Sequence, residues 1–194
     1  MKTTNIMIVG VGGQGSLLAS KLLGKLLVDE GFDVKVSEVH GMSQRGGSVV
    51  TYVKFGNKVF SPIIDKGEAD FIVSFEKLEA ARWVEFLKEG GTIVTNTQRI
   101  DPMPVITGAA EYPDDIIDQI KALGINIDAF DALSSARDAG SSKAVNIVLM
   151  GRLAKYLNIP AEKWKKAICD TVPAKFTSVN LKAFEFGFGE TMEA

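Results

Sequence analysis

The chain begins with an apolar run that leads through a glycine-rich turn into a helix. Residues 6–9 are Ile, Met, Ile and Val, glycines dominate residues 10–15, and the leucines of residues 17–30 recur every three or four positions. That recurrence is typical of an amphipathic helix. Valines alternate with polar residues in 32–39, so residues 6–39 predict a strand, a helix and a second strand, the βαβ unit.

Strand and helix patterns continue to alternate along the chain. In residues 48–60, side chains of two kinds alternate along the chain on both sides of a turn at Gly56 and Asn57. This pattern predicts an antiparallel hairpin. Further strands are predicted at 69–75, 92–95, 105–106 (a short edge strand) and 125–130, and helices at 76–88, 114–123, 131–139, 142–156, 161–171 and 179–186. We therefore predict an α/β fold: a Rossmann-like three-layer domain over residues 1–194, with a mainly parallel sheet and an inserted antiparallel hairpin.

The composition is that of an ordinary globular protein and changes this picture little. Hydrophobic residues make up 46% and charged residues 24%, with a net charge of −2. This balance offers no basic field for nucleic acid. No apolar run approaches the about 20 residues that span a bilayer, and the first residues lack a signal-peptide pattern, so we expect a cytoplasmic protein without a membrane segment.

The chain has one cysteine and one histidine. Cys169 can form no internal disulfide and cannot by itself hold an iron–sulfur cluster, and we expect it in the core. His40 would have only carboxylates beside it as metal ligands, which disfavours zinc, so we expect a hydrogen-bonding histidine. Residues from Phe188 onward are expected to pack loosely.

The glycine-rich turn is the first candidate binding element. Its G-x-G-x-x-G spacing follows a strand and precedes a helix, the arrangement that lets backbone N–H groups approach an anion at a helix start. The alternative is a tight turn whose glycines serve packing only. The candidate residues are Gly10, Gly12, Gly13, Gln14, Gly15 and Ser16.

A second candidate element follows the second strand. Carboxyl ends of neighbouring parallel strands share one edge of a sheet, so residues 38–47 should face the glycine turn. Arg45 offers a permanently charged fork for a phosphate or carboxylate, or else ties down its own loop. Asn146 could reach the same end of the sheet or bond a neighbouring loop. The candidates of the second loop are Glu38, Ser43, Gln44, Arg45, Gly46 and Gly47.

Taken together, these motifs carry a family resemblance. The turn at 10–15, the loop at 43–48 and the Ser61-Pro62 pair resemble, in order and spacing, the gamma-type domain of the 2-oxoacid:ferredoxin oxidoreductases. Residues 38–47 most resemble the members that act on arylpyruvates such as indolepyruvate. The resemblance covers nearly the whole chain, and the combination of turn and loop is more specific than the turn alone.

The resemblance implies an oxidative decarboxylation that this chain cannot perform alone. In that family thiamine diphosphate with Mg²⁺ and 4Fe-4S clusters handle the 2-oxoacid and its electrons, ferredoxin accepts the electrons, and coenzyme A accepts the acyl group. A large alpha subunit is expected to carry those cofactors, and no cofactor is assigned to this chain alone. No catalytic residue is assigned either. An isolated chain, with its partner-facing surface exposed, could form a homodimer.

Two other functions remain open from the sequence. Glu38 lies where a ribose-binding acid of an NAD(P)-dependent dehydrogenase would lie, although the tyrosine–lysine or histidine arrangement of such an enzyme is missing. The other alternative is a non-catalytic scaffold subunit that only stabilises its partner.

Overall fold

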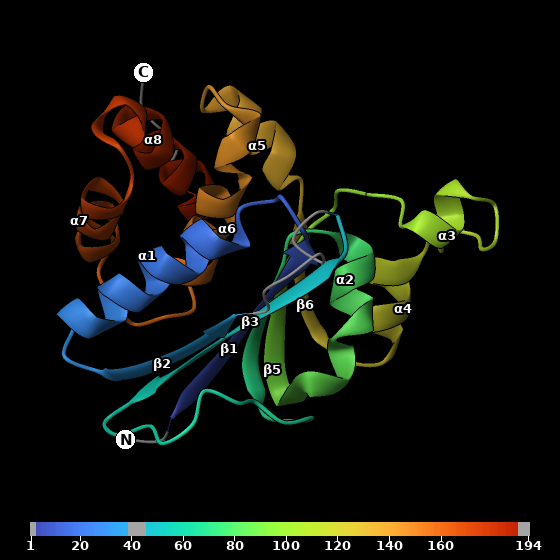
Figure 1. The fold of residues 1–194 in the computed structure, drawn as a ribbon, viewed down its shortest axis with the longest axis horizontal. Coiled ribbons are helices and arrows are strands. Elements are labelled where there is room, and N and C mark those ends of the chain that lie inside the picture. The colour runs from blue at the N-terminus through green and yellow to red at the C-terminus, as the bar shows by residue number, and fades with distance from the viewer. Residues whose placement is uncertain (1–2, 39–45, 190–194) are drawn as a thin grey trace.

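The computed structural model describes residues 3–38 and 46–189 and has a six-stranded sheet between two layers of helices (Figure 1). The predicted three-layer α/β fold is thereby confirmed. The strands are β1 (Thr4–Val11), β2 (Asp33–Glu38), β3 (Ser48–Gly56), β4 (Ala69–Ser74), β5 (Leu87–Asn96) and β6 (Asn126–Phe130). The α-helices are α1 (Ser16–Asp29), α2 (Lys77–Arg82), α3 (Met103–Ile106), α4 (Ile116–Ala122), α5 (Ala132–Asp138), α6 (Val145–Ala154), α7 (Ala161–Thr171) and α8 (Thr177–Phe188), with 3-10 turns at Val84–Phe86, Ser142–Ala144 and Ala174–Phe176.

The strand order is β2-β3-β1-β4-β5-β6. Strands β4, β5 and β6 extend the sheet from β1 in parallel pairings, whereas β3 is antiparallel to both β1 and β2. The expectation that β1 and β2 end side by side is therefore wrong, because β3 lies between them. Its first residue, Ser48, is nevertheless opposite Val11, so the chain entering β3 starts beside the glycine turn.

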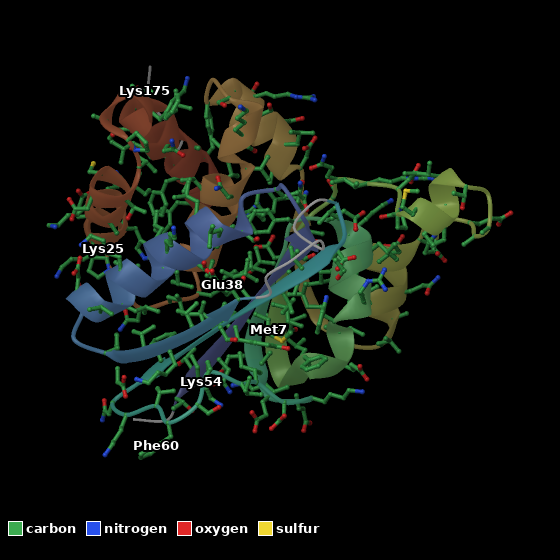
Figure 2. The ribbon with its side chains drawn as sticks, in the orientation of Figure 1. Met7, Lys25, Glu38, Lys54, Phe60 and Lys175 are labelled. Carbon is green, nitrogen blue, oxygen red and sulfur yellow. The ribbon has the colours of Figure 1, made fainter. Side chains whose placement is uncertain are left out.

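The predicted hairpin over residues 48–60 is also wrong in its second half. Strand β3 ends at Gly56, and β2 is its antiparallel partner on the outer side. The chain after β3 is attached by a side chain instead, since the amide of Val59 donates to Oδ2 of Asp33 over 2.8 Å. Phe60 then projects at the end of the molecule where the chain begins (Figure 2).

Other differences from the predicted elements are local. The helix expected over 76–88 ends at Arg82, and β5 begins at Leu87 and runs through the two glycines that were predicted to precede it. The predicted edge strand at 105–106 belongs to helix α3, which projects from the body (Figure 1). Cys169 is exposed rather than in the core, and Phe188 is not loose because it stacks on Phe184, 5.7 Å between ring centroids.

Two apolar cores lie on the two faces of the sheet. Alternate side chains of β1 contribute to each of the two cores, because successive residues of a strand point to opposite faces of the sheet. Ile6 and Ile8 pack under the face covered by α1, α6 and α8, and Met7 and Val9 under the face covered by α2 and α4. The central strand is thus buried on both faces. Within the described residues, no helix is both long and apolar enough to cross a bilayer.

Helices α6 and α8 approach each other through two glycines. A Cβ on Gly187 would lie 1.9 Å from the carbonyl oxygen of Val148, and one on Gly151 would lie 2.3 Å from that of Phe184. Since the obstructing atoms are backbone, neither helix can yield by turning a side chain. The last helix is therefore held against α6 at backbone contact.

Replacing Gly187 by alanine is expected to destabilise the fold by about 3 kcal/mol, because overpacking against backbone forces the two helices apart. The matched control is Gly24→Ala in α1, where the nearest atom to a new Cβ is 3.8 Å away and the gain in helix propensity should stabilise by about 0.5–1 kcal/mol. Urea denaturation of both variants measures the difference. Equal midpoints for the two variants would refute the backbone contact.

Candidate functional site

The glycine turn is fixed by the side chain of Gln14. Its Oε1 accepts from the amide of Val11 over 2.8 Å, and its Nε2 donates to the carbonyl of Phe75 over 3.1 Å. These bonds join the ends of β1 and β4, so the side chain of Gln14 holds the turn in place. The amide of Gly12 donates to the carbonyl of Gly47 over 2.9 Å, which brings the two candidate loops together at this point.

Three amides of the turn have no acceptor among the described residues: those of Gly13, Gly15 and Ser16. Gly13 and Gly15 have φ values of 99° and 89°, a region that glycine enters without steric penalty. Gly15 also serves as the N-cap of α1, which has no side-chain cap. The turn therefore presents free backbone donors at the positive end of a helix, as an anion cradle requires.

Packing explains two of the glycines. A Cβ on Gly10 would lie 2.9 Å from Cβ of Phe75, and one on Gly15 would lie 2.8 Å from Nδ2 of Asn146. That Nδ2 donates to the carbonyl of Gly15 over 3.2 Å. Of the two expectations for Asn146, bonding to a neighbouring loop is confirmed, and the loop it bonds is the glycine turn.

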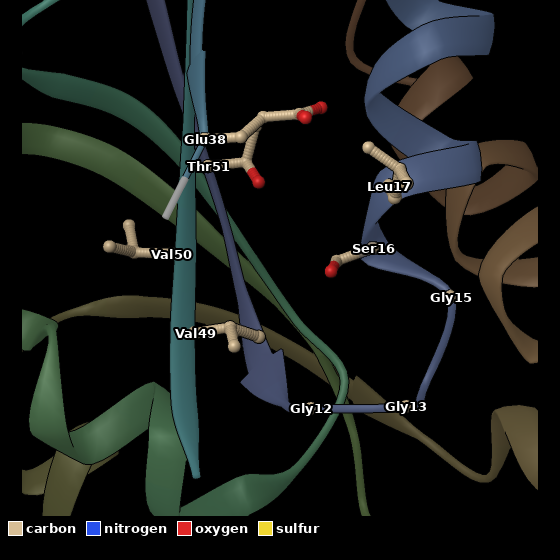
Figure 3. A pocket seen from close by; sticks show the side chains of 9 residues that line it. All are labelled: Gly12, Gly13, Gly15, Ser16, Leu17, Glu38, Val49, Val50 and Thr51. Carbon is tan, nitrogen blue, oxygen red and sulfur yellow. The ribbon is translucent and has the colours of Figure 1, made fainter. Parts of the chain in front are cut away.

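A cavity of about 260 Å³ opens between the start of α1 and the strands β2 and β3 (Figure 3). We call it the Glu38 cavity. Ser16 and Leu17 face Glu38 and Thr51 across it (Figure 3). Its full lining is Gly12, Gly13, Gly15, Ser16, Leu17, Glu38, Val49, Val50 and Thr51.

Glu38 is the only charged side chain in the described lining of this cavity. Its Oε1 accepts from Oγ of Ser20 over 2.6 Å, and it pairs with Thr51 across β2 and β3. In a dinucleotide-binding fold the ribose-binding acid ends the strand next to β1. Here β3 intervenes, which places Glu38 one strand farther from the turn and disfavours the NAD(P) alternative.

Gly46 and Gly47 line a separate cavity of about 160 Å³, which we call the Glu79 cavity. Oγ of Ser48 donates to the buried carboxylate of Glu79, and Nε of Arg82 donates to its other oxygen over 3.1 Å. Glu76, buried beside it, caps α2 and accepts from the hydroxyl of Tyr112. Burial and this carboxylate hold the pKa of Tyr112 well above its usual range.

Sequence reasoning missed Glu76 and Glu79, although two glutamates three residues apart directly after a buried strand were a visible signal. Ser43, Gln44 and Arg45, with His40, lie outside the described residues. Within the described residues, no group of three or more His, Cys, Asp or Glu side chains could hold a metal ion.

Comparison with known proteins gives consistent matches over nearly the whole chain. A family model described as pyruvate ferredoxin/flavodoxin oxidoreductase matches residues 5–190. Indolepyruvate oxidoreductase subunit IorB of Thermococcus kodakarensis is 44% identical over 194 residues, covering 96% of this chain and 95% of that protein.

Two solved structures share the fold. Pyruvate oxidoreductase subunit PORC of Thermotoga maritima matches with a TM-score of 0.73 at 22% identity, covering 98% of this chain and 97% of that one. The 2-oxoglutarate:ferredoxin oxidoreductase of Magnetococcus marinus, solved with 2-oxoglutarate, coenzyme A and succinyl-CoA bound, matches with a TM-score of 0.69 at 19% identity. The match covers 97% of this chain but 31% of that one, so the same fold there forms part of a longer chain.

Replacing Gln14 by alanine is expected to destabilise the protein by about 1–2 kcal/mol, because the amide of Val11 loses its acceptor. The control is Gln119→Ala, which removes an exposed bond to Asp115 on α4 and should change stability by less than about 0.5 kcal/mol. Denaturant unfolding of both variants gives the two values. A Gln14 variant as stable as its control would show that the side chain does not hold the turn.

Proposed function

Because the chain belongs to the pyruvate ferredoxin/flavodoxin oxidoreductase family, we propose that it is the smaller subunit of a thiamine-dependent 2-oxoacid:ferredoxin oxidoreductase acting on arylpyruvates such as indolepyruvate. The observation that carries the proposal is the nearly full-length identity to proteins named indolepyruvate oxidoreductase subunit IorB. The chain spans 95% of the length of the T. kodakarensis relative.

The proposed reaction converts an arylpyruvate and coenzyme A to an arylacetyl-CoA and CO₂, with two electrons passing to ferredoxin. Bound to the complex, thiamine diphosphate would supply the electron sink for the electron pair left behind when CO₂ is lost. The residues of this chain do not provide the sites for 4Fe-4S clusters or for thiamine diphosphate with Mg²⁺. One cysteine cannot hold a 4Fe-4S cluster, and no Gly-Asp-Gly sequence opens a diphosphate–Mg²⁺ site. The proposal therefore places thiamine diphosphate, Mg²⁺ and the clusters on a large alpha subunit.

The contribution of this chain is to complete the partner's site with fixed polar groups. The free backbone donors of Gly13, Gly15 and Ser16 sit at the start of α1, and Glu38 lies across a cavity from this segment. Arg45, seven residues after Glu38 in the sequence, is the proposed charged clamp for a carboxylate or phosphate. Support for a companion comes from the 2-oxoglutarate oxidoreductase, in which this fold is part of a longer chain.

Co-expression with the candidate alpha subunit tests the proposal. We expect no activity from this chain alone and CoA-dependent reduction of ferredoxin by indolepyruvate from the purified complex. The control is the alpha subunit expressed alone. Full activity of that control would support the scaffold alternative, and a complex that reduces ferredoxin with pyruvate but not with arylpyruvates would reject the proposed substrate class.

Arg45→Ala in the assembled complex should lower kcat/KM for the arylpyruvate or for coenzyme A by at least about tenfold, because a hydrogen bond to a charged group contributes roughly 1.5–3 kcal/mol. Lys121→Ala removes an exposed cation on α4 and should leave the kinetics unchanged. Steady-state assays with each substrate varied separately locate the effect. Unchanged turnover and KM values for the Arg45 variant would remove it from the site.

A further inference from the structure

An arm projects from the body of the protein between β5 and α4. It comprises residues 100–112, with helix α3 in its first half, and extends away from the sheet (Figure 1). We call this segment the α3 arm. Residues 102–110 read Pro-Met-Pro-Val-Ile-Thr-Gly-Ala-Ala, a run without any charge in a chain of which 24% is charged. All of these residues are exposed except Pro102 and Val105.

The arm presents two large apolar side chains to solvent. Met103 is 67% exposed and Ile106 is 66% exposed, and they share one face of α3 because they are three residues apart on a helix. Val105 instead packs against the core beneath α2 and α4 and so ties the helix to the body. A continuous exposed apolar patch of this kind is typical of a surface that another molecule covers.

Both ends of the arm are fixed by one buried carboxylate oxygen. Oε1 of Glu76 accepts from the amide of Ile100 over 3.2 Å and from the hydroxyl of Tyr112. Glu76 is only 1% exposed, so water cannot compete freely for these bonds. The arm is therefore held by its root although its tip projects.

Arg99 closes the root from the outside. Its guanidinium lies 4.3 Å from the ring centroid of Tyr112 and bonds Asp101 over 2.6 Å and Asp114 over 3.2 Å, one on each side of the arm. A projection whose two ends are fixed in advance loses less conformational entropy when a partner binds it.

Carboxylates border the apolar tip. Asp101 and Glu111 directly flank the uncharged run, Asp114 and Asp115 follow, and Arg99 is the one cation in residues 99–115. An apolar centre within a charged border is the usual anatomy of a protein–protein interface.

The sign of this border selects the partner. A second copy of the chain, docked through the same surface on both sides, would place carboxylates against carboxylates. An anionic lipid surface would be repelled for the same reason. The complementary partner is a protein with an apolar pocket edged by lysine or arginine side chains.

The root of the arm is continuous with the glycine turn. Pro102 and Met103 line the Glu79 cavity together with Gly47, whose carbonyl accepts from the amide of Gly12 in the turn. A partner seated on the arm therefore lies beside the segment through which this chain is proposed to complete its partner's site.

We propose that the α3 arm is the docking element that seats this chain on a larger, different subunit, with Met103 and Ile106 entering an apolar pocket bordered by basic side chains. Naming that partner as the alpha subunit of the oxidoreductase rests on the proposed function. The argument that the arm docks a different chain rather than a second copy does not.

Binding of the full chain to the immobilised alpha subunit tests the arm. Met103→Asp combined with Ile106→Asp should raise the Kd by at least about tenfold, because charges would enter the apolar centre of the interface. The matched control is Val28→Asp combined with Phe60→Asp, which adds the same charges at two other apolar residues, 59% and 85% exposed, and should leave the Kd unchanged.

A second pair of variants tests the acidic border. Glu111→Lys should slow association with the alpha subunit, and the difference from the unmodified chain should shrink as salt is raised, because the attraction is screened. Glu89→Lys makes the same charge reversal on an exposed residue of β5 and should leave association unchanged.

An unchanged Kd for the Met103/Ile106 variant, or an equal loss for both double variants, would overturn the inference. Sedimentation of the chain alone is the companion measurement: a dimer that the Met103/Ile106 variant dissociates would show that a second copy covers the arm and would overturn it as well. The proposed function fails separately. A complex that forms through the arm but does not oxidise arylpyruvates rejects that function alone, and an active complex with unchanged affinity in the variant rejects the arm alone.

Discussion

The bonds made by the side chain of Gln14 are the constraint on which the candidate sites depend. By accepting from Val11 and donating to Phe75, this one amide joins the ends of two adjacent parallel strands. Asn146 holds the other end of the turn through the Gly15 carbonyl. The free amides between these two attachments are therefore presented by a turn fixed at both sides, which lowers the ordering entropy that a ligand would otherwise have to offset.

The turn also explains why two dissimilar cavities share one border. Strand β3, inserted beside β1, supplies Thr51 on the same wall as Glu38. The chain after β5 and β6 lines a second groove that contains Arg137 and Lys143, on the other side of the turn. One backbone segment thus separates an acidic cavity from a cationic one. The two cavities therefore differ in charge although both are lined by Gly13 and Gly15.

Much of the fold was predictable where the information is local. Residues 6–30 contain the strand, the positive-φ glycines and the leucine stripe within one stretch, and β1 and α1 were expected within two residues of their observed bounds. The place of β3 was not predictable, because pairing with β1 is decided by distant residues. A short apolar run such as Val105–Ile106 has no periodicity that separates helix from strand, and it proved helical.

The sites show the same division. The amides of the turn could be expected from glycine spacing, but Arg137 and Lys143 are more than a hundred residues away in sequence and reach the turn only through the packing of α5 and α6. Gln14 was expected to face a ligand. The sequence around it gives no sign that its amide instead donates to the carbonyl of Phe75, which lies 61 residues later, directly after β4.

The backbone contact between α6 and α8 links the order of synthesis to the site. Helix α8 is the last described element, and through Gly151 and Gly187 it positions α6, whose Asn146 holds the glycine turn. The glycine turn precedes α6 and α8 by more than a hundred residues, so the bond from Asn146 can form only after these helices have been synthesised. A chain that ends before α8 would thus contain the motif without the rigid receptor that α6 and α8 complete.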